Sequence, residues 1–363
     1  MRRYVLVILP LSLLVFQSAG GSARGVQEPI VGALSDHAQD KFLDADPNIS
    51  REDYLEALKL YRKKAEADSK TYLPYVAWIL FHLGHMDRRQ GRLEEASNSY
   101  AESLEIWRDL AKMDPDSFLP YVAMTHNARG NIELVRDQMS QAWKDHAEAL
   151  QIWRKLAETD SQVYLPLVGR TLRALADADR GQSQPERARK EQVEAVQIYR
   201  RLAAQDPNHL NDLADALREL GSNDSDQGRV HEARRELTNA LDIYRSLSAI
   251  DSDSNAPFIA FVLSGLGDLD SAGGRVNEAR KEYNESVEIT RRLALRDPDN
   301  HLPNLATSLN SLANLDFSYN RKDDAKREYA EVLKILQQLA IHDPAGVKLF
   351  LEITQANLRR LSE

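Results

Sequence analysis

Acidic residues recur along the chain at a nearly constant spacing, and this regularity makes them the first candidates for chemistry. Successive members are 46, 46, 45, 46 and 46 residues apart: Asp87, Glu133, Asp179, Asp224, Asp270 and Asp316. A row of carboxylates could bind cations or a basic ligand. Each carboxylate could instead form an ion pair within its repeat or cap a turn, with basic partners early in the next helix such as Arg234, Arg280 or Lys326. We favour this second interpretation, because an acid near a helix C-terminus opposes the helix dipole and needs a compensating partner.

The remaining residues offer little for catalysis or metal binding. His82 and His85 form an i, i+3 pair, but a metal site would need further ligands of suitable geometry. The absence of cysteine excludes thiolate zinc sites, iron–sulfur clusters and cysteine nucleophiles. The sequence also lacks a phosphate-binding loop, a Gly-rich dinucleotide motif and a Gly-x-Ser-x-Gly turn. We therefore predict a protein that is not an enzyme, with no catalytic residues, no cofactor and no metal.

An internal repeat must position these side chains. The segment Leu-Pro-Tyr-Val-Ala at 73–77 recurs with the same steps as the acids, and its later copies begin at Leu119, Leu165, Leu210, Ala256 and Leu302. Apolar or small residues follow at offsets +3, +4, +7, +10 and +11 from its first residue. This is the one-sided stripe of a helix, here called helix A. The +11 residue is always Gly or Ala, which lets a partner helix approach closely.

A second apolar stripe, helix B, follows helix A in every repeat. A residue that tolerates left-handed backbone separates the two helices: Gly91, Asp137, Ser183, Gly228, Gly274 or Asn320. Helix B ends at Asp-Pro or Asp-Ser, as at Asp114-Pro115, where proline cannot continue the helix. The pattern divides the mature chain into a degenerate N-terminal unit at 24–72, six repeats at 73–346 and a C-terminal capping helix at 347–363.

The N-terminal residues differ from the rest of the chain. Arg2 and Arg3 precede an apolar stretch from Val5 to Phe16, and small residues follow as far as Ala23. This layout is typical of a secretory signal peptide and is too short to span a bilayer, which takes ~20 apolar residues. We predict a signal peptide at 1–23 and an exported bacterial protein, periplasmic or extracellular, whose mature chain does not insert into the membrane. An uncut leader would instead tether the protein to the membrane.

The overall charge argues against one class of partner. The formal net charge is −9, and Lys and Arg are spread among acids instead of clustering. A general nucleic-acid binder needs a basic excess to neutralise phosphates. We therefore do not expect a nucleic-acid partner.

Each repeat resembles a tetratricopeptide repeat. In the first full repeat the matching residues are Leu80, Leu83, Gly84, Gly91, Ala96, Tyr100 and Ser103, and in the fifth they are Leu263, Leu266, Gly267, Gly274, Ala279, Tyr283 and Ser286. The period exceeds the family's usual ~34 residues and is similar to that of kinesin-light-chain-type and bacterial arrays. The resemblance implies an all-α fold, a right-handed α-solenoid of antiparallel helix pairs wound into a superhelix.

The resemblance also implies that helix A residues at offsets +5, +8 and +12 line a concave groove. From these positions we predict ten partner-binding residues: Trp78, Phe81, Asn127, Asn131, Arg170, Arg173, Arg218, Phe261, Asn310 and Asn314. Aromatic, cationic and amide side chains in this order suit an extended peptide, because Asn can hydrogen-bond a peptide backbone and Arg can pair with a carboxylate.

The predicted function is therefore a scaffold that binds a protein or peptide partner. A structural spacer that binds nothing and a regulatory subunit of an exported enzyme complex remain alternatives. The pattern identifies neither the partner nor the oligomeric state.

Overall fold

The computed structural model describes residues 50–248 and 254–361. The predicted leader at 1–23 and residues 24–49 of the predicted degenerate N-terminal unit lie outside this range. Within the described residues every regular element is a helix, which confirms the all-α prediction. The fold divides into two compact units, residues 1–191 (unit 1) and 192–363 (unit 2).

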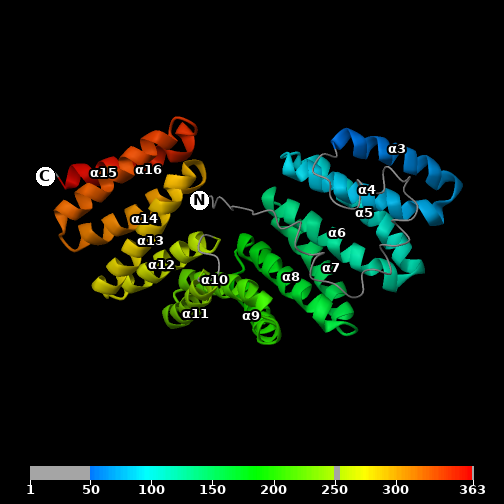
Figure 1. Ribbon diagram of the computed structural model, residues 1–363, viewed down its shortest axis with the longest axis horizontal. Helices are drawn as coiled ribbons and strands as arrows, with labels where there is room; N and C mark the ends of the chain where they lie inside the picture. Colours follow the sequence, from blue (N-terminus) through cyan, green and yellow to red (C-terminus); the bar gives the residue numbers. More distant parts are fainter. Residues whose placement is uncertain (1–49, 249–253, 362–363) are drawn as a thin grey trace. The chain divides into compact units, whose positions relative to one another are not determined.

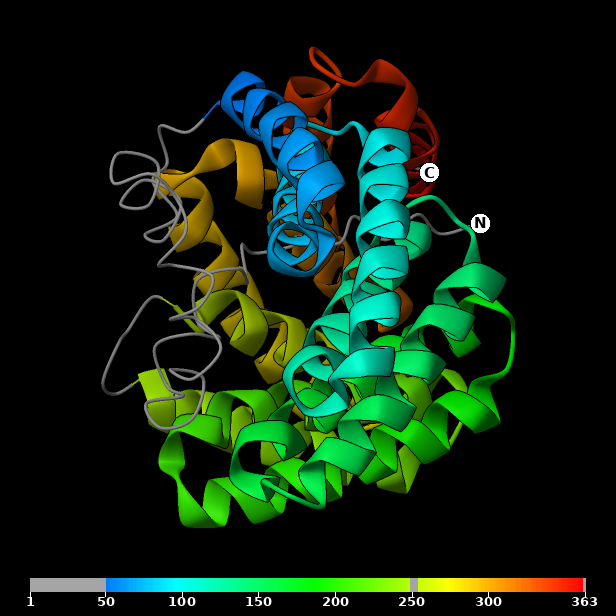
Figure 2. The same ribbon diagram turned by 90° about the vertical axis from the view of Figure 1, so that its right-hand side faces the viewer.

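Unit 1 is a series of helices that pack in chain order. It contains α3 (Arg51–Ala67), α4 (Ser69–Arg89), α5 (Leu93–Met113), α6 (Pro115–Val135), α7 (Met139–Ala157), α8 (Ser161–Gly181) and the start of α9 (Pro185–Gln205). Each helix from α3 to α8 contacts the next one along the chain. Figures 1 and 2 show these helices side by side, with neighbours running in opposite directions.

Unit 2 repeats the arrangement from the remainder of α9 onward. A 3-10 turn (Pro207–His209) precedes α10 (Leu210–Asp226), α11 (Val230–Ser248), α12 (Ala256–Ala272), α13 (Val276–Arg296), α14 (Pro298–Ser318), α15 (Lys322–Leu339) and α16 (Pro344–Arg360). Helix A of the six repeats corresponds to α4, α6, α8, α10, α12 and α14. Helix B corresponds to α5, α7, α9, α11, α13 and α15.

An aspartate directly precedes the next helix A at most repeat boundaries and caps the new helix. Asp114 is the residue between α5 and α6, and its carboxylate accepts a hydrogen bond from the Ser117 amide at 3.2 Å. The same contact starts α4, α8, α14 and α16 at Asp68, Asp160, Asp297 and Asp343. The cap satisfies an amide that has no partner within the helix, so helix A begins about one turn before the Leu-Pro pair. Pro74, Pro120, Pro166 and Pro303 therefore lie inside their helices, beyond the first turn.

The small residue at offset +11 makes room for a large side chain of helix B. A Cβ added to Gly84 would lie 2.7 Å from the Tyr100 ring, and one added to Gly267 would lie 2.6 Å from the Tyr283 ring. Both tyrosines are buried. The close approach of helix A and helix B expected from the sequence is confirmed at these two repeats.

The turn between helix A and helix B uses left-handed backbone in all six repeats. The φ angle is +74° at Gly91, +71° at Gly228 and +72° at Gly274, and it is +60°, +59° and +58° at Asp137, Ser183 and Asn320. Left-handed backbone brings Cβ close to the following carbonyl oxygen, and glycine avoids this contact. The predicted turn residues are therefore confirmed, with three repeats retaining a side chain on strained backbone.

Exchanging residues between these turns should change stability in opposite directions. Gly274→Ala places a side chain on left-handed backbone and should lower the free energy of unfolding by about 1 kcal/mol. Ser183→Gly removes such a side chain and should raise it by a similar amount. Urea denaturation of the two variants measures both changes, and equal shifts in the same direction would contradict the explanation.

Candidate functional site: the A face

The A face is the side of each helix A that carries the residues at offsets +5, +8 and +12. Because an α-helix has 3.6 residues per turn, residues three, four and seven apart share one side. The opposite side of each helix A is buried, so it repeats the same apolar types. The chemical types on the A face differ from repeat to repeat, and all ten predicted binding residues occupy it.

The aromatic end of the A face on α4 is largely withdrawn from solvent. Phe81 is 5% exposed and packs with Tyr100 in a core cluster. Its assignment to a binding groove is therefore wrong, because helix B and the next repeat cover the ring. Trp78 is partly exposed, and its ring contacts His82 at a centroid separation of 4.3 Å and the edge of Tyr121 on α6 at 6.1 Å.

The histidine pair of α4 does not gain further ligands. The ring centroids of His82 and His85 are 6.4 Å apart. Burial lowers the pKa of His82 to about 4 and that of His85 to about 3, so both rings are neutral at neutral pH. No group of three or more His, Cys, Asp or Glu side chains that could hold a metal gathers anywhere in the described part of the chain.

Asn127 is bound to its own neighbours. Its Nδ2 donates to the Thr171 hydroxyl of α8 at 2.7 Å, and its Oδ1 lies 3.1 Å from His146 Nδ1 of α7. Burial lowers the pKa of His146 to about 4. The neutral ring therefore donates its one N–H to Asn127. The Asn127 amide thus joins three helices, whereas Asn131 on the same face is exposed.

A buried polar network beside Asn127 goes beyond the sequence prediction. His126 Nδ1 lies 2.7 Å from Asp145 Oδ1, and Arg129 Nε donates to Asp145 Oδ2 at 2.9 Å. Burial by itself would raise the pKa of Asp145, but the hydrogen bonds from His126, Arg129 and Gln141 outweigh it and lower the pKa. The carboxylate is therefore ionised and holds α6 against α7.

This His–Asp pair cannot act as an acid–base catalyst on a bound substrate. His126 is 2% exposed and Asp145 is 1% exposed, and Arg108 lies 3.0 Å from the second ring nitrogen of His126. The sequence contains a signal for the network, since His126 replaces the leucine at the same offset in other repeats, such as Leu80 and Leu172.

Cations on α8 give the A face of unit 1 a positive charge. Arg170 and Arg173 are three residues apart on the same side of α8, and both are partly exposed. Asp177 lies on that side as well and pairs with Arg180 at 2.9 Å. Two of the predicted groove arginines are thus together on one helix.

Arg218 and Phe261 form a contact between α10 and α12 in unit 2. The guanidinium carbon of Arg218 lies 5.5 Å from the centre of the Phe261 ring. Arg218 Nη2 also lies 3.3 Å from Glu219 and 3.9 Å from Asp215. Arg218 is therefore held by its own unit, while the Phe261 residue is 49% exposed. The predicted cationic middle of the groove loses one of its three arginines to this internal contact.

The amides of α14 have different surroundings. Asn314 Oδ1 accepts a hydrogen bond from the Tyr329 hydroxyl of α15. Asp268 takes the same role for Tyr283 in the preceding repeat, at 2.6 Å. The +12 side chain of these repeats therefore anchors the tyrosine of helix B, and Asn310 lies partly buried on the same side.

The recurring acids form ion pairs within their own repeat, and some of them also pair with the preceding repeat. Asp87, Asp179, Asp270 and Asp316 are 0% exposed. Asp87 pairs with Arg51 at 2.7 Å from the preceding helix B and with Arg92 at 2.6 Å from its own turn. Asp270 pairs in the same way with Arg234 and Arg275. These acids are therefore structural, as predicted, but at Asp87, Asp270 and Asp316 a partner also comes from helix B of the preceding repeat.

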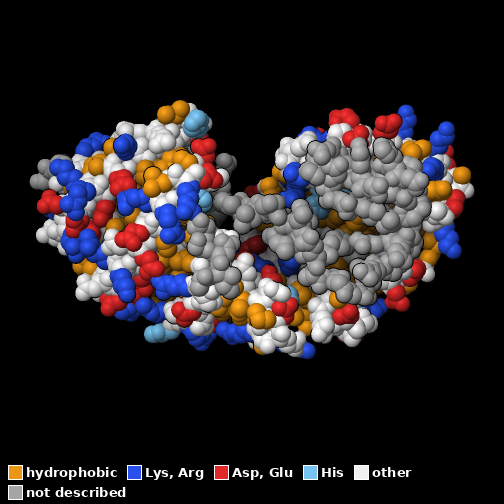
Figure 3. All heavy atoms as spheres, viewed as in Figure 1, with side chains coloured by type: hydrophobic (Ala, Val, Ile, Leu, Met, Phe, Trp, Pro, Cys, Tyr) orange, Lys and Arg blue, Asp and Glu red, His pale blue; other side chains and the backbone are white. Residues whose placement is uncertain are grey.

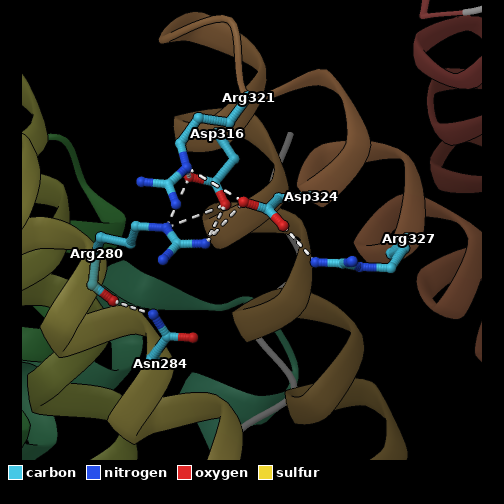
Figure 4. Close-up of polar contacts among 6 residues, drawn as sticks. All are labelled: Arg280, Asn284, Asp316, Arg321, Asp324 and Arg327. Atoms are coloured by element: carbon cyan, nitrogen blue, oxygen red, sulfur yellow. Dashed lines mark hydrogen bonds and ion pairs between the residues drawn. The ribbon is translucent and has the colours of Figure 1, made fainter.

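Figure 4 shows the last of these sites, where Arg280 and Arg321 approach the Asp316 carboxylate and Asp324 lies beside them. Arg280 of α13 reaches both oxygens of Asp316 on α14 at 2.9 and 3.0 Å, and its Nη2 lies 3.2 Å from Asp324 of α15. Arg321 approaches Asp316 from the turn at 3.5 Å. The predicted partner Lys326 does not appear among these contacts.

Removing one arginine from this site should be costly. Arg280→Ala leaves the buried Asp316 carboxylate with Arg321 alone, and we expect a loss of about 2–3 kcal/mol in the free energy of unfolding. Arg291→Ala is the matched control, because Arg291 also lies on α13 and pairs with the next repeat through Glu331 at 2.9 Å. Both side chains of that pair are exposed, so its loss should stay below about 1 kcal/mol. Equal losses in chemical denaturation would contradict the role of the buried carboxylate.

Two further carboxyl groups lie against the recurring acids. Burial raises the pKa of Glu282 to about 7 and that of Glu328 to about 8, and the neighbouring Asp270 and Asp316 carboxylates add to the shift. The folded state therefore holds these protons more tightly than the unfolded chain, in which the pKa is 4.5. Stability from both groups is fully present below pH 4.5 and is lost as the pH rises through 7 and 8.

The free energy of unfolding should consequently fall as the pH rises from about 4.5, where the unfolded carboxyls ionise, to about 8, where the folded ones do, and these two groups should add no further change above that pH. The buried histidines act in the opposite direction only between about pH 4 and 6.5, because their folded pKa values are lowered from 6.5. Glu328→Gln should flatten the decline, and denaturation at a series of pH values measures it. A wild-type profile parallel to that of Glu328→Gln would contradict the assignment.

The comparisons with known proteins agree with the repeat architecture. Residues 49–109 match the family model for the tetratricopeptide repeat. This segment of the chain contains tetratricopeptide repeat sequence. No curated protein matches its sequence. Tetratricopeptide repeats of this kind account for the helix pairs, the turn and the small residue at offset +11.

Solved structures with a similar fold come from several organisms. BtubC (BKLC) from P. vanneervenii has a TM-score of 0.54 and 20% sequence identity, over 68% of this chain and 91% of that one. A putative kinesin light chain from Podosopora anserina with nearly identical TPR-like repeats has a TM-score of 0.46 and 18% identity, over 61% and 96%. Pseudomonas aeruginosa PilF has a TM-score of 0.47 and 18% identity, over 77% and 96%. The BtubC likeness shows a shared fold.

Proposed function

We propose that this tetratricopeptide-repeat chain is a non-catalytic scaffold that binds a protein or peptide through its A face. The observation that carries the proposal is the division of each helix A into two sides. One side repeats the same buried residue types, while the A face changes from aromatic on α4 to cationic on α8 and to Phe261 with acids on α10 and α12. A surface that only had to stay hydrated would not need an exposed aromatic ring, and such rings are enriched where proteins bind one another.

The chemistry of the site supports binding in preference to turnover. The buried His126–Asp145 pair has both ring nitrogens engaged, and the acids with the greatest burial are paired with arginines. A regulatory subunit of an exported enzyme complex is the second candidate, and it would use the same face.

Export is part of the proposal. The N-terminal layout of Arg2, Arg3, an apolar stretch and small residues up to Ala23 supports it. None of the described helices is long and apolar enough to cross a membrane. We place the working protein outside the cytoplasm of a bacterium, free or tethered by its leader.

An affinity capture compares the intact A face with altered ones. The chain from Arg24 should retain a partner that the double variant Arg170→Glu/Arg173→Glu or the variant Phe261→Ser loses. The matched control is Arg201→Glu, an exposed position on helix B, which should retain it. Each charge reversal is expected to weaken binding by about tenfold.

Mass spectrometry of the exported chain should find Arg24 at its N-terminus.

Two outcomes would count against the proposal. If neither the chain from Arg24 nor any variant retains a partner above background, the result supports the alternative that the protein is a structural spacer. If Arg201→Glu loses the partner and the A face variants keep it, binding uses the helix B side instead.

A further inference from the structure

The A faces of the two units differ in charge. In unit 2 basic residues are scarce on the face that carries an exposed aromatic ring. α12 and α14 contain no Lys or Arg, and Arg218 is the one cation of α10. Arg218 is held between Glu219, Asp215 and the Phe261 ring. The A face of α8 in unit 1, by contrast, carries Arg170 and Arg173.

Phe261 begins a short series of small and acidic residues on α12. One turn along the same side of α12 follow Ser264 and Gly265, and Asp268 follows one further turn on. Neither Ser264 nor Gly265 is large enough to cover the Phe261 ring. Asp268 is exposed although one of its oxygens accepts the Tyr283 hydroxyl at 2.6 Å.

The neighbouring helices complete this surface without covering the ring. α12 contacts both α10 and α14, and the hydroxyls of Ser264, Ser286 and Ser308 form a chain from α12 through α13 to α14, with steps of 2.9 and 3.0 Å. On α10, Asp226 is exposed about two turns beyond Arg218, and Arg218 itself is paired with Glu219 at 3.3 Å. The exposed face that carries the ring therefore has carboxylates on two helices, Asp268 on α12 and Asp226 on α10.

Further hydrophobic side chains lie towards the C-terminal end of the same unit. Leu349 and Ile353 of α16 are 69% and 48% exposed, and Figure 3 shows hydrophobic side chains gathered over α14 and α16. Val347 and Phe350 of the same helix instead pack on the core formed by α14 and α15. Unit 2 thus combines an acidic A face with apolar side chains on α12 and α16 that the described chain does not cover.

We propose that the A face of unit 2 binds a basic peptide segment. An apolar side chain of the segment packs on Phe261 beside Ser264 and Gly265, and adjacent Lys or Arg side chains pair with Asp268 and Asp226. The charge of the face selects this occupant, because an acidic peptide or a nucleic acid would meet carboxylates. The inference rests on the proposed function and specifies the kind of partner that unit 2 binds.

Fluorescence anisotropy with short labelled peptides tests this assignment. Three peptides share a central leucine and carry Lys, Glu or Ser at the surrounding positions. The Lys peptide should bind to the chain from Arg24 and weaken as salt is added, since added ions screen exposed charges. The Glu and Ser peptides should bind at least about tenfold more weakly.

Variants locate the binding surface. Phe261→Ser should weaken the Lys peptide by about tenfold. Asp268→Asn retains an acceptor for the Tyr283 hydroxyl and should weaken binding by about threefold through the lost charge. Asp242→Asn removes an exposed carboxylate from α11 on the helix B side and should leave the affinity unchanged.

The results separate this inference from the proposed function. Equal binding of the Lys and Ser peptides would overturn the proposal that the bound peptide is basic. Equal effects of Asp268→Asn and Asp242→Asn on the affinity would overturn it as well. A partner that is captured through Arg170 and Arg173 alone would leave the scaffold in place and overturn the assignment of unit 2. Self-association that Phe261→Ser abolishes would replace the peptide by a second copy of the chain. Absence of both peptide binding and partner capture would contradict both proposals.

Discussion

The buried carboxylate near the end of helix A is the constraint on which the repeat depends. Asp270 and Asp316 have no exposed surface, and an ionised carboxylate in such a place needs a charged partner. The partner comes from two directions, from the turn of the same repeat and from helix B of the preceding one. The same ion pair therefore fixes the turn inside a repeat and the stacking between repeats.

This constraint also explains where the chain is free to vary. The core side of helix A must fit helix B, as at Gly267 and Tyr283, and the acid must meet its arginines. Neither requirement fixes the residue types of the A face, although Asn127, Asp268 and Asn314 there also bond to neighbouring helices. The side chains there can be aromatic in one repeat and cationic in another without disturbing the stack, which is the arrangement expected of a binding scaffold built from repeats.

The second and third repeats depart from the rule. Their turns carry Gln138 and Gln184 where the other four carry arginine, and Ser97 and Trp143 stand where the arginine of the preceding helix B would lie. Asp179 is instead approached by Arg187 at 3.2 Å, whose guanidinium carbon lies 4.8 Å from the centre of the Trp143 ring. The ion pair is kept with a different arginine, so the constraint applies to the charge balance and not to one position.

The sequence by itself determined the helix pairs, the left-handed turn at Gly91 and its equivalents, and the structural role of the acids. These features follow from local backbone chemistry and from apolar periodicity, which act between residues close in the chain. Start positions of helix A were missed by one turn, because the Asp cap works through a side-chain bond that the apolar stripe does not reveal.

Only the tertiary structure decided which A face residues are accessible. Phe81 and Phe261 occupy comparable positions in the pattern, yet one ring is 5% exposed and the other residue 49%. Asn127 and Arg218 are engaged by residues 44 positions away on α8 and 43 positions away on α12. Exposure and pairing of a side chain depend on the neighbouring repeats, and a single repeat's sequence does not contain them.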